Sequence, residues 1–190
     1  EIEKIESFKD GKLIEAKKIN YGNNWNGNIS YLPNQIQSSL GNAPLETEVT
    51  YDQYDSKGNL LQYTTKDGIV TSIIWGYNGT QPIAKVVGYP YSVLSSLATS
   101  IVSSSDQDAA NPANEANLIA QLNAFRQLPD LSEAQITTYT YDPLIGVTSI
   151  TPPSGIREVY LYDTANRLKE IRENSASGKI LKEFKYNYKQ

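Results

Sequence analysis

Residues 54–78 read YDSKGNLLQYTTKDGIVTSIIWGYN, and their first seven letters carry the clearest structural signal in the chain. The same seven-residue pattern returns near the C-terminal end, where residues 162–168 read YDTANRL. The Tyr, the Asp and the final Leu stand at identical spacing in both copies. One kind of local structure is therefore predicted at two distant places in the chain.

The repeated unit is interpreted as a strand, a tight turn and a second strand. The Tyr ends the incoming strand, and the Asp carboxylate accepts hydrogen bonds from backbone N–H groups ahead of it. The fifth position leaves the turn at positive φ, which Gly adopts without steric cost and Asn tolerates. The Leu then begins the outgoing strand on its buried face. The residues of this turn motif are Tyr54, Asp55, Gly58 and Leu60 in the first copy and Tyr162, Asp163, Asn166 and Leu168 in the second.

Other turn signals predict hairpins. Asp10-Gly11 lies between alternating apolar residues and predicts a hairpin over residues 1–21. Asp67-Gly68, taken as a two-residue turn, would place Thr64 opposite Thr71. Residues 22–45 are rich in Asn, Gly, Ser and Pro, so we expect an extended loop there, with a short strand near Ile29–Tyr31.

Strand-like segments also follow the first Tyr-Asp unit and fill the last third of the chain. Residues 167–173 are ambiguous, because their composition favours a helix. The remaining predicted strands are residues 49–54, 60–65, 69–77, 82–88, 136–142, 146–151, 156–163 and 180–188.

Residues 91–129 have a different pattern and predict a two-helix insertion. Apolar residues recur at helical spacing from Val93 to Val102, with Ser on the other side. A polar linker is expected at residues 103–111, after which Asn111 caps and Pro112 opens a second helix.

Composition excludes several kinds of chemistry. The 190 residues carry a net charge of −4 and contain no Cys, His or Met. There is therefore no thiolate nucleophile, Cys-based zinc site or His general base. The charge balance does not indicate nucleic-acid binding, and no apolar run is long enough for a membrane span. Without Met, the chain does not begin at a start codon, and we expect a processed form or an excised segment.

Carboxylates and aromatic residues supply the remaining candidates for a site. Several Asp residues stand in or beside turns, where backbone bonding explains them without catalysis: Asp52, Asp55, Asp67, Asp142 and Asp163. Tyr is frequent, at 14 residues against 3 Phe, as expected for strands whose faces are only partly buried. Trp75 and Tyr77 would share a strand face on which a sugar ring could stack, although packing of Trp75 against a neighbouring strand is the simpler interpretation. Trp25 is a second candidate for an exposed ring.

The Tyr-Asp units resemble the YD repeats of bacterial Rhs proteins, which also occur in teneurins and insecticidal toxin complexes. The blocks YDSKGNLLQYTTKDG, WGYNGTQPIAKV, TTYTYDPLIGVTSITPPSG and YLYDTANRLKEI carry the resemblance, over most of residues 46–190. It implies long hairpins laid side by side, often as a hollow shell around a C-terminal cargo, and it implies that residues 167–171 form a strand. Two features depart from the pattern: the Gly of Tyr141-Asp142-Pro143-Leu144-Ile145-Gly146 comes one residue late, and the helical insertion is foreign to a plain repeat.

We therefore expect a mainly β protein of antiparallel hairpins, a single domain over residues 1–190 with a helical insertion at 91–129. The expected function is non-enzymatic: a structural module of a large exported or cell-surface bacterial Rhs protein, whose partners are the neighbouring repeats. No catalytic residue, cofactor or metal is predicted, and neither is a nucleic-acid partner. The alternative is a carbohydrate-binding module that recognises cell-surface glycans through Trp75 and Tyr77.

Overall fold

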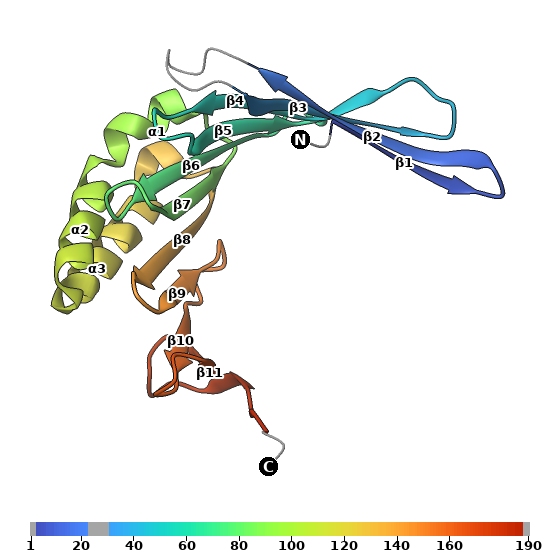
Figure 1. Cartoon of the computed structure of the whole chain (residues 1–190). Coiled ribbons are helices and arrows are strands. Elements are labelled where there is room, and N and C mark those ends of the chain that lie inside the picture. The colour runs from blue at the N-terminus through green and yellow to red at the C-terminus, as the bar shows by residue number, and fades with distance from the viewer. Residues whose placement is uncertain (1–2, 23–30, 188–190) are drawn as a thin grey trace. The chain divides into compact units, whose positions relative to one another are not determined.

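The computed structural model describes residues 3–22 and 31–187, and these residues form a mainly β protein. Its 12 strands form one sheet of antiparallel hairpins, in which each strand is hydrogen-bonded to the next one along the chain (Figure 1). This confirms the predicted fold class. The strands are β1 Lys4–Lys9, β2 Lys12–Gly22, β3 Leu32–Leu40, β4 Glu46–Tyr54, β5 Leu60–Thr65, β6 Val70–Gly76, β7 Gln81–Val87, β8 Gln135–Asp142, β9 Gly146–Thr151, β10 Glu158–Tyr162, β11 Leu168–Glu173 and β12 Ile180–Glu183.

The chain divides into two compact units. The first contains Glu1–Ile73 and Val87–Val93, and the second contains Ile74–Val86 and Leu94–Gln190. The single domain expected over the whole chain stays a prediction.

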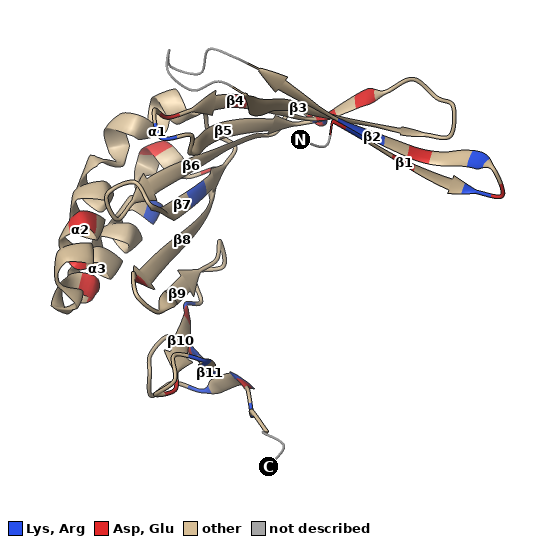
Figure 2. Cartoon of the chain, viewed as in Figure 1, with Lys and Arg blue, Asp and Glu red and all other residues tan. Residues whose placement is uncertain are grey.

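The first hairpin of the first unit forms at Asp10-Gly11, as predicted. Lys9 pairs with Lys12, so the loop has two residues. Asp10 has φ of 50° and Gly11 has φ of 75°, which is the turn that matches the twist of a two-residue hairpin. Acidic and basic residues are interspersed along both strands of this hairpin (Figure 2).

Strand β3 lies where the sequence predicts a loop, so that prediction is wrong for residues 32–40. β3 pairs with β2 on one side and with β4 on the other. Its polar side chains bond across the strands: Asn20 Nδ2 donates to Gln35 Oε1 at 3.2 Å, and Gln35 Nε2 donates to Thr47 Oγ1 at 2.7 Å. Cross-strand pairing of this kind stabilises a strand whose composition is typical of a loop.

Part of the predicted loop lies outside the described residues. Trp25 and residues 29–30 of the predicted short strand belong to that part. Tyr31, the last residue of the predicted strand, is described and is not in a strand.

The register of the β5–β6 hairpin differs from the prediction by one residue. Thr64 lies opposite Val70 rather than Thr71. The loop has three residues, 66–68, and Gly68 is the positive-φ residue at 79° that closes such a loop. An Asp-Gly pair therefore predicted the turn but not its length.

The helical segment of the chain holds three α-helices rather than two. The helices are α1 Tyr91–Leu97, α2 Thr99–Ala110 and α3 Glu115–Arg126, with the short 3-10 helices η1 Pro112–Asn114 and η2 Pro129–Leu131. Asn111 is a cap, but of η1 rather than of the predicted second helix: its side chain accepts a hydrogen bond from Ala113 N at 3.1 Å, and Pro112 takes the first position of η1. The α-helix itself begins at Glu115.

The polar linker predicted at residues 103–111 is wrong, because all but the last of these residues belong to α2. Ser105 is fully buried and Asp108 is 2% exposed, so this polar face of α2 points inward. These buried polar groups have partners on the turn between β6 and β7. Ser105 Oγ accepts from Tyr77 N, and Asp108 Oδ2 accepts from the Tyr77 hydroxyl.

Helices α2 and α3 supply much of the core of the second unit. The side chains that bury most completely there are Ile74, Ile83, Val86, Leu94, Ile101, Leu118 and Leu131. Arg126 ties the end of α3 to the strands, because its guanidinium donates to the carbonyl oxygens of Ile136, Thr151 and Pro152. The helices thus hold one face of the strands that follow them.

Candidate functional site: the Tyr-Asp turns

The first Tyr-Asp unit forms the turn between β4 and β5. Asp55 Oδ1 accepts hydrogen bonds from Lys57 N at 2.8 Å and Asn59 N at 2.9 Å. Asp55 Oδ2 accepts a third from Asn59 Nδ2 at 2.9 Å. Gly58 has φ of 86°, in the left-handed region where only Gly is unstrained. The carboxylate therefore points into its own turn.

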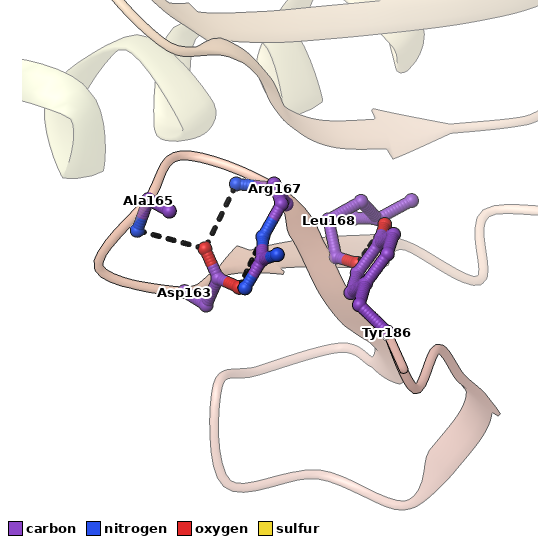
Figure 3. Close-up of polar contacts among 5 residues, drawn as sticks. All are labelled: Asp163, Ala165, Arg167, Leu168 and Tyr186. Atoms are coloured by element: carbon purple, nitrogen blue, oxygen red, sulfur yellow. Dashed lines mark hydrogen bonds and ion pairs between the residues drawn. The ribbon is translucent and has the colours of Figure 1, made fainter. Parts of the chain in front are cut away.

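The second unit forms the turn between β10 and β11 with the same geometry (Figure 3). Asp163 Oδ1 accepts from Ala165 N at 2.8 Å and Arg167 N at 3.0 Å. Asp163 Oδ2 accepts from Arg167 Nε at 2.8 Å and Arg167 Nη2 at 2.6 Å. Asn166 takes the place of Gly58 at φ of 57°.

The two turns differ in the side chain that donates to the second oxygen, Oδ2, of the Asp carboxylate. It is the neutral Asn59 in the first turn and the cationic Arg167 in the second. Hydrogen bonds from the side chain of Arg167, and to a smaller extent from its backbone, lower the pKa of Asp163 to about 2. Asp163 is therefore a stable anion over the whole physiological range.

A third, irregular copy occupies the turn between β8 and β9. Asp142 Oδ1 accepts from Leu144 N at 2.9 Å, as the other two carboxylates do from the residue two positions ahead. Gly146 then pairs with Asp142 across the turn, at φ of 142°. The late Gly noted in the sequence therefore changes how the turn closes while the Asp keeps its first backbone bond.

The tyrosine hydroxyls of all three units make the same kind of hydrogen bond, which the sequence did not reveal. Each donates to a backbone carbonyl of the strand that precedes its own in the chain. The bonds are Tyr54 to Pro33 at 2.8 Å, Tyr141 to Pro82 at 2.9 Å and Tyr162 to Val147 at 2.8 Å. The amphipathic character of Tyr is the sequence signal behind this, since a half-buried phenol seeks a partner for its hydroxyl.

Burial keeps these phenol hydroxyls protonated, so they can act as hydrogen-bond donors. It raises the pKa of Tyr54 and of Tyr141 to about 12, and it also raises the pKa of Tyr162. All three hydroxyls are thus protonated at neutral pH.

The leucines that end the motif lie opposite its tyrosines, Leu60 across from Tyr54 and Leu168 across from Tyr162. Both leucines are half-buried rather than fully buried. The second turn has an additional cover, because Tyr186 donates its hydroxyl to Leu168 O at 2.9 Å (Figure 3). The Arg167 guanidinium carbon lies 4.7 Å from the centre of the Tyr186 ring.

Tyr77 cannot offer its ring to a sugar, which corrects the proposed stacking pair. It is 2% exposed, and it belongs to the turn after β6 with φ of 51° rather than to the strand. Its hydroxyl donates to Asp108 Oδ2 at 2.7 Å and accepts from Tyr141 N at 2.8 Å. Trp75, at the end of β6, is half-buried, and its part in glycan binding stays a prediction.

The buried Asp108, which bonds to Tyr77, has two half-buried carboxylates nearby, Glu115 and Asp142, and the sequence did not predict this grouping. Burial raises the pKa of Asp108, and the nearby carboxylates of Glu115 and Asp142 raise it further, against the lowering effect of the Tyr77 bond. Glu115 Oε1 accepts from the hydroxyls of Thr140 and Thr148. A bulge in the β8–β9 pairing leaves Thr148 without a residue opposite it in the ladder. Its hydroxyl can therefore reach Glu115 Oε1.

Among the residues that the structure describes, no three or more Asp or Glu side chains are grouped so as to hold a metal ion. In the same residues, no helix is both long and apolar enough to span a membrane.

Comparison with known proteins finds resemblance only among solved structures. No family model matches the chain, and no curated protein matches it. A crystal structure of TcdB2-TccC3 is similar over 90% of this chain and 8% of that one, with 9% identity and a TM-score of 0.45. The Photorhabdus luminescens Tc holotoxin pore is similar over 96% of this chain and 8% of that one, with 9% identity and a TM-score of 0.45. The chain thus spans about a twelfth of the length of each, and the likeness is one of chain path alone.

Proposed function

We propose that this chain is a non-enzymatic structural module of a large exported or cell-surface bacterial protein of the Rhs type. Its role is to extend a sheet of hairpins whose turns are locked by Tyr-Asp units. The observation that carries the proposal is the bonding of these units: three tyrosine hydroxyls and three aspartates bond to the surrounding backbone. Side chains used in this way stabilise a scaffold and are not available to a substrate.

The two outer strands of the sheet also support a scaffold. β1 and β12 stand at the ends of the strand order, and all of their residues are exposed. Large apolar side chains are among them, with Phe8 62% and Ile180 48% exposed. Open edges with apolar side chains promote association, so proteins normally pair or cover them. Neighbouring repeats of a parent protein would do so here.

Hydrogen exchange tests this proposal. Amide exchange in β1 and β12 is measured in the isolated chain and in a longer form that carries the flanking sequence of the parent protein. We expect the outward-facing amides of both strands to exchange quickly in the isolated chain and to be protected at least about 100-fold in the longer form. The amides of β8 and β9, which are paired on both sides, serve as the internal control. Equal exchange of the edge amides in the two forms contradicts the proposal.

A glycan array separates the scaffold from the carbohydrate-binding alternative. The scaffold proposal expects no saturable binding that depends on Trp75. Binding that is lost in Trp75→Ala, with the circular dichroism spectrum unchanged, would favour the alternative.

A further inference from the structure

A surface cavity of about 390 Å³ in the second unit has features of a small-molecule site. Its lining residues come from β9, from β10 and the residue before it, from the N-terminal part of α3, and from the loop between β11 and β12. Its volume falls in the range of about 300–1,000 Å³ that is usual for ligand pockets. None of the Tyr-Asp turns lines it.

The cavity lining includes an anion. Glu115 stands at the start of α3, and its Oε1 is held by the hydroxyls of Thr140 and Thr148. These two bonds leave Oε2 as an acceptor. Ile119 lies four residues along α3, so it shares the helix face of Glu115 and also lines the cavity.

The cavity lining also includes a cation. Arg157 precedes β10, and its Nη2 donates to the backbone oxygen of Asn174, which anchors the guanidinium. Its Nε is buried and has no hydrogen-bond partner among the described residues. A buried donor without an acceptor is rare in folded proteins, and a bound group commonly supplies the missing acceptor.

The rest of the cavity lining is mixed. Residues 157, 159 and 161 lie on one face of the β10 segment, so Val159 and Leu161 share that face with Arg157. Ile119 and Ala176 add to the apolar part of the lining, and the polar part consists of Thr148, Ser149, Tyr160 and Ser175. No bond between Glu115 and Arg157 is formed among the described residues, so each charge is open to a separate partner.

We propose that this cavity binds a short zwitterionic peptide. Its ammonium group would meet Glu115, its carboxylate would meet Arg157, and an aliphatic side chain would rest on Val159 and Leu161. The two opposite charges in the lining favour a zwitterionic peptide over a neutral sugar, which has no ionic group to pair with either of them. This proposal is independent of the scaffold function.

Titration of the ¹⁵N-labelled chain with alanyl-leucine tests it by NMR. We expect saturable shifts at residues that line the cavity. N-acetyl-alanyl-leucine, which lacks the ammonium, and alanyl-leucinamide, which lacks the carboxylate, should each bind about tenfold or more weakly. Glu115→Gln and Arg157→Gln should weaken binding of alanyl-leucine by a similar factor. Glu133→Gln and Lys179→Gln neutralise one exposed charge of each sign outside the cavity and should leave the affinity unchanged.

Ala176→Trp guards against variants that fail to fold. This residue lies in an exposed loop, so a larger side chain should fill the cavity and abolish binding without disturbing the core. Absence of saturable shifts in the wild-type chain overturns the proposal. So does equal affinity for the free and the two blocked dipeptides, or binding that survives Ala176→Trp.

Discussion

The Tyr77 hydroxyl lies 2.7 Å from Asp108 Oδ2, and this bond joins the turn between β6 and β7 to helix α2. Asp108 is 2% exposed, and its Oδ1 has no hydrogen-bond partner among the described residues. The same hydroxyl accepts from Tyr141 N, and the Tyr77 and Tyr141 rings pack edge to face with centres 5.4 Å apart. One phenol therefore serves a helix, a turn and a strand, and it keeps Tyr77 at a positive φ that Tyr rarely adopts.

Tyr77→Phe should lower the free energy of unfolding by about 2–3 kcal/mol, because the change leaves a buried carboxyl and a buried backbone N–H without their partner. Urea unfolding followed by circular dichroism measures this. Tyr139→Phe is the matched control, at a half-buried tyrosine, and should change stability by less than about 0.5 kcal/mol. Equal stability of the two variants would show that the Tyr77 hydroxyl is not structurally important.

Asp108→Asn should stabilise the protein at neutral pH. Burial raises the pKa of Asp108 above its ordinary value of 3.8, so the folded protein holds this proton more tightly than the unfolded chain. The stability that Asp108 contributes is therefore complete below pH 3.8 and is lost as pH rises through the folded pKa. We expect the advantage of Asp108→Asn over the wild type to grow with pH across this interval and then level off.

Urea unfolding at a series of pH values measures this difference. Asp130→Asn, at an exposed position in η2, is the control for a general change in charge. A wild type that is more stable than Asp108→Asn at pH 7 would contradict the expectation.

Arg167→Gln should raise the pKa of Asp163 from about 2 towards its ordinary value of 3.8, because the hydrogen bonds of Arg167 are the main cause of the low value. A lowered pKa means that Asp163 stabilises the fold above pH 3.8 and that this contribution is lost as pH falls through about 2. The carboxyl ¹³C shift of Asp163 followed against pH reports the pKa directly. Arg172→Gln, which breaks an ion pair with Glu170 on β11, should leave the Asp163 titration in place.

Single changes of Tyr54, Tyr141 and Tyr162 to Phe should each lower the free energy of unfolding by about 1 kcal/mol, the usual net value of one hydrogen bond. All three hydroxyls donate to a carbonyl of the preceding strand, so the losses should be similar. Thermal or urea unfolding measures them, with Tyr63→Phe as the control. If Tyr141→Phe were neutral while the other two were not, the irregular third unit would not share the function of the regular pair.

Gly76→Ala should lower the free energy of unfolding by about 1–3 kcal/mol through overpacking. A Cβ at this position would lie 2.1 Å from Ser105 Oγ and 2.9 Å from side-chain atoms of Ile83. Removing the nearer atom in the double variant Gly76→Ala/Ser105→Ala should recover part of the loss. A double-mutant cycle that shows simple additivity would mean that the close approach of α2 to β6 is not the cause.

Interactions among residues close together in the sequence determine much of the fold. Asp10-Gly11 and the Tyr-Asp units place their turns correctly, because positive φ and carboxylate bonding to nearby N–H groups involve only a few consecutive residues. A strand at residues 167–171 is predicted only by the resemblance to the YD repeats, since the composition of residues 167–173 favours a helix. Pairing with β10 and β12 overrides that preference, and the strand covers residues 168–173.

The tertiary structure alone decided the features that depend on partners far away in the chain. Residues 32–40 look like a loop and become β3, because β2 and β4 satisfy both of its edges. Residues 103–110 look like a linker and become part of α2, because Ser105 and Asp108 find partners on the turn at Tyr77. No periodicity reveals such pairs. A sequence pattern records which face of a segment is apolar, whereas a buried polar group is tolerated only when a specific distant atom completes its hydrogen bond.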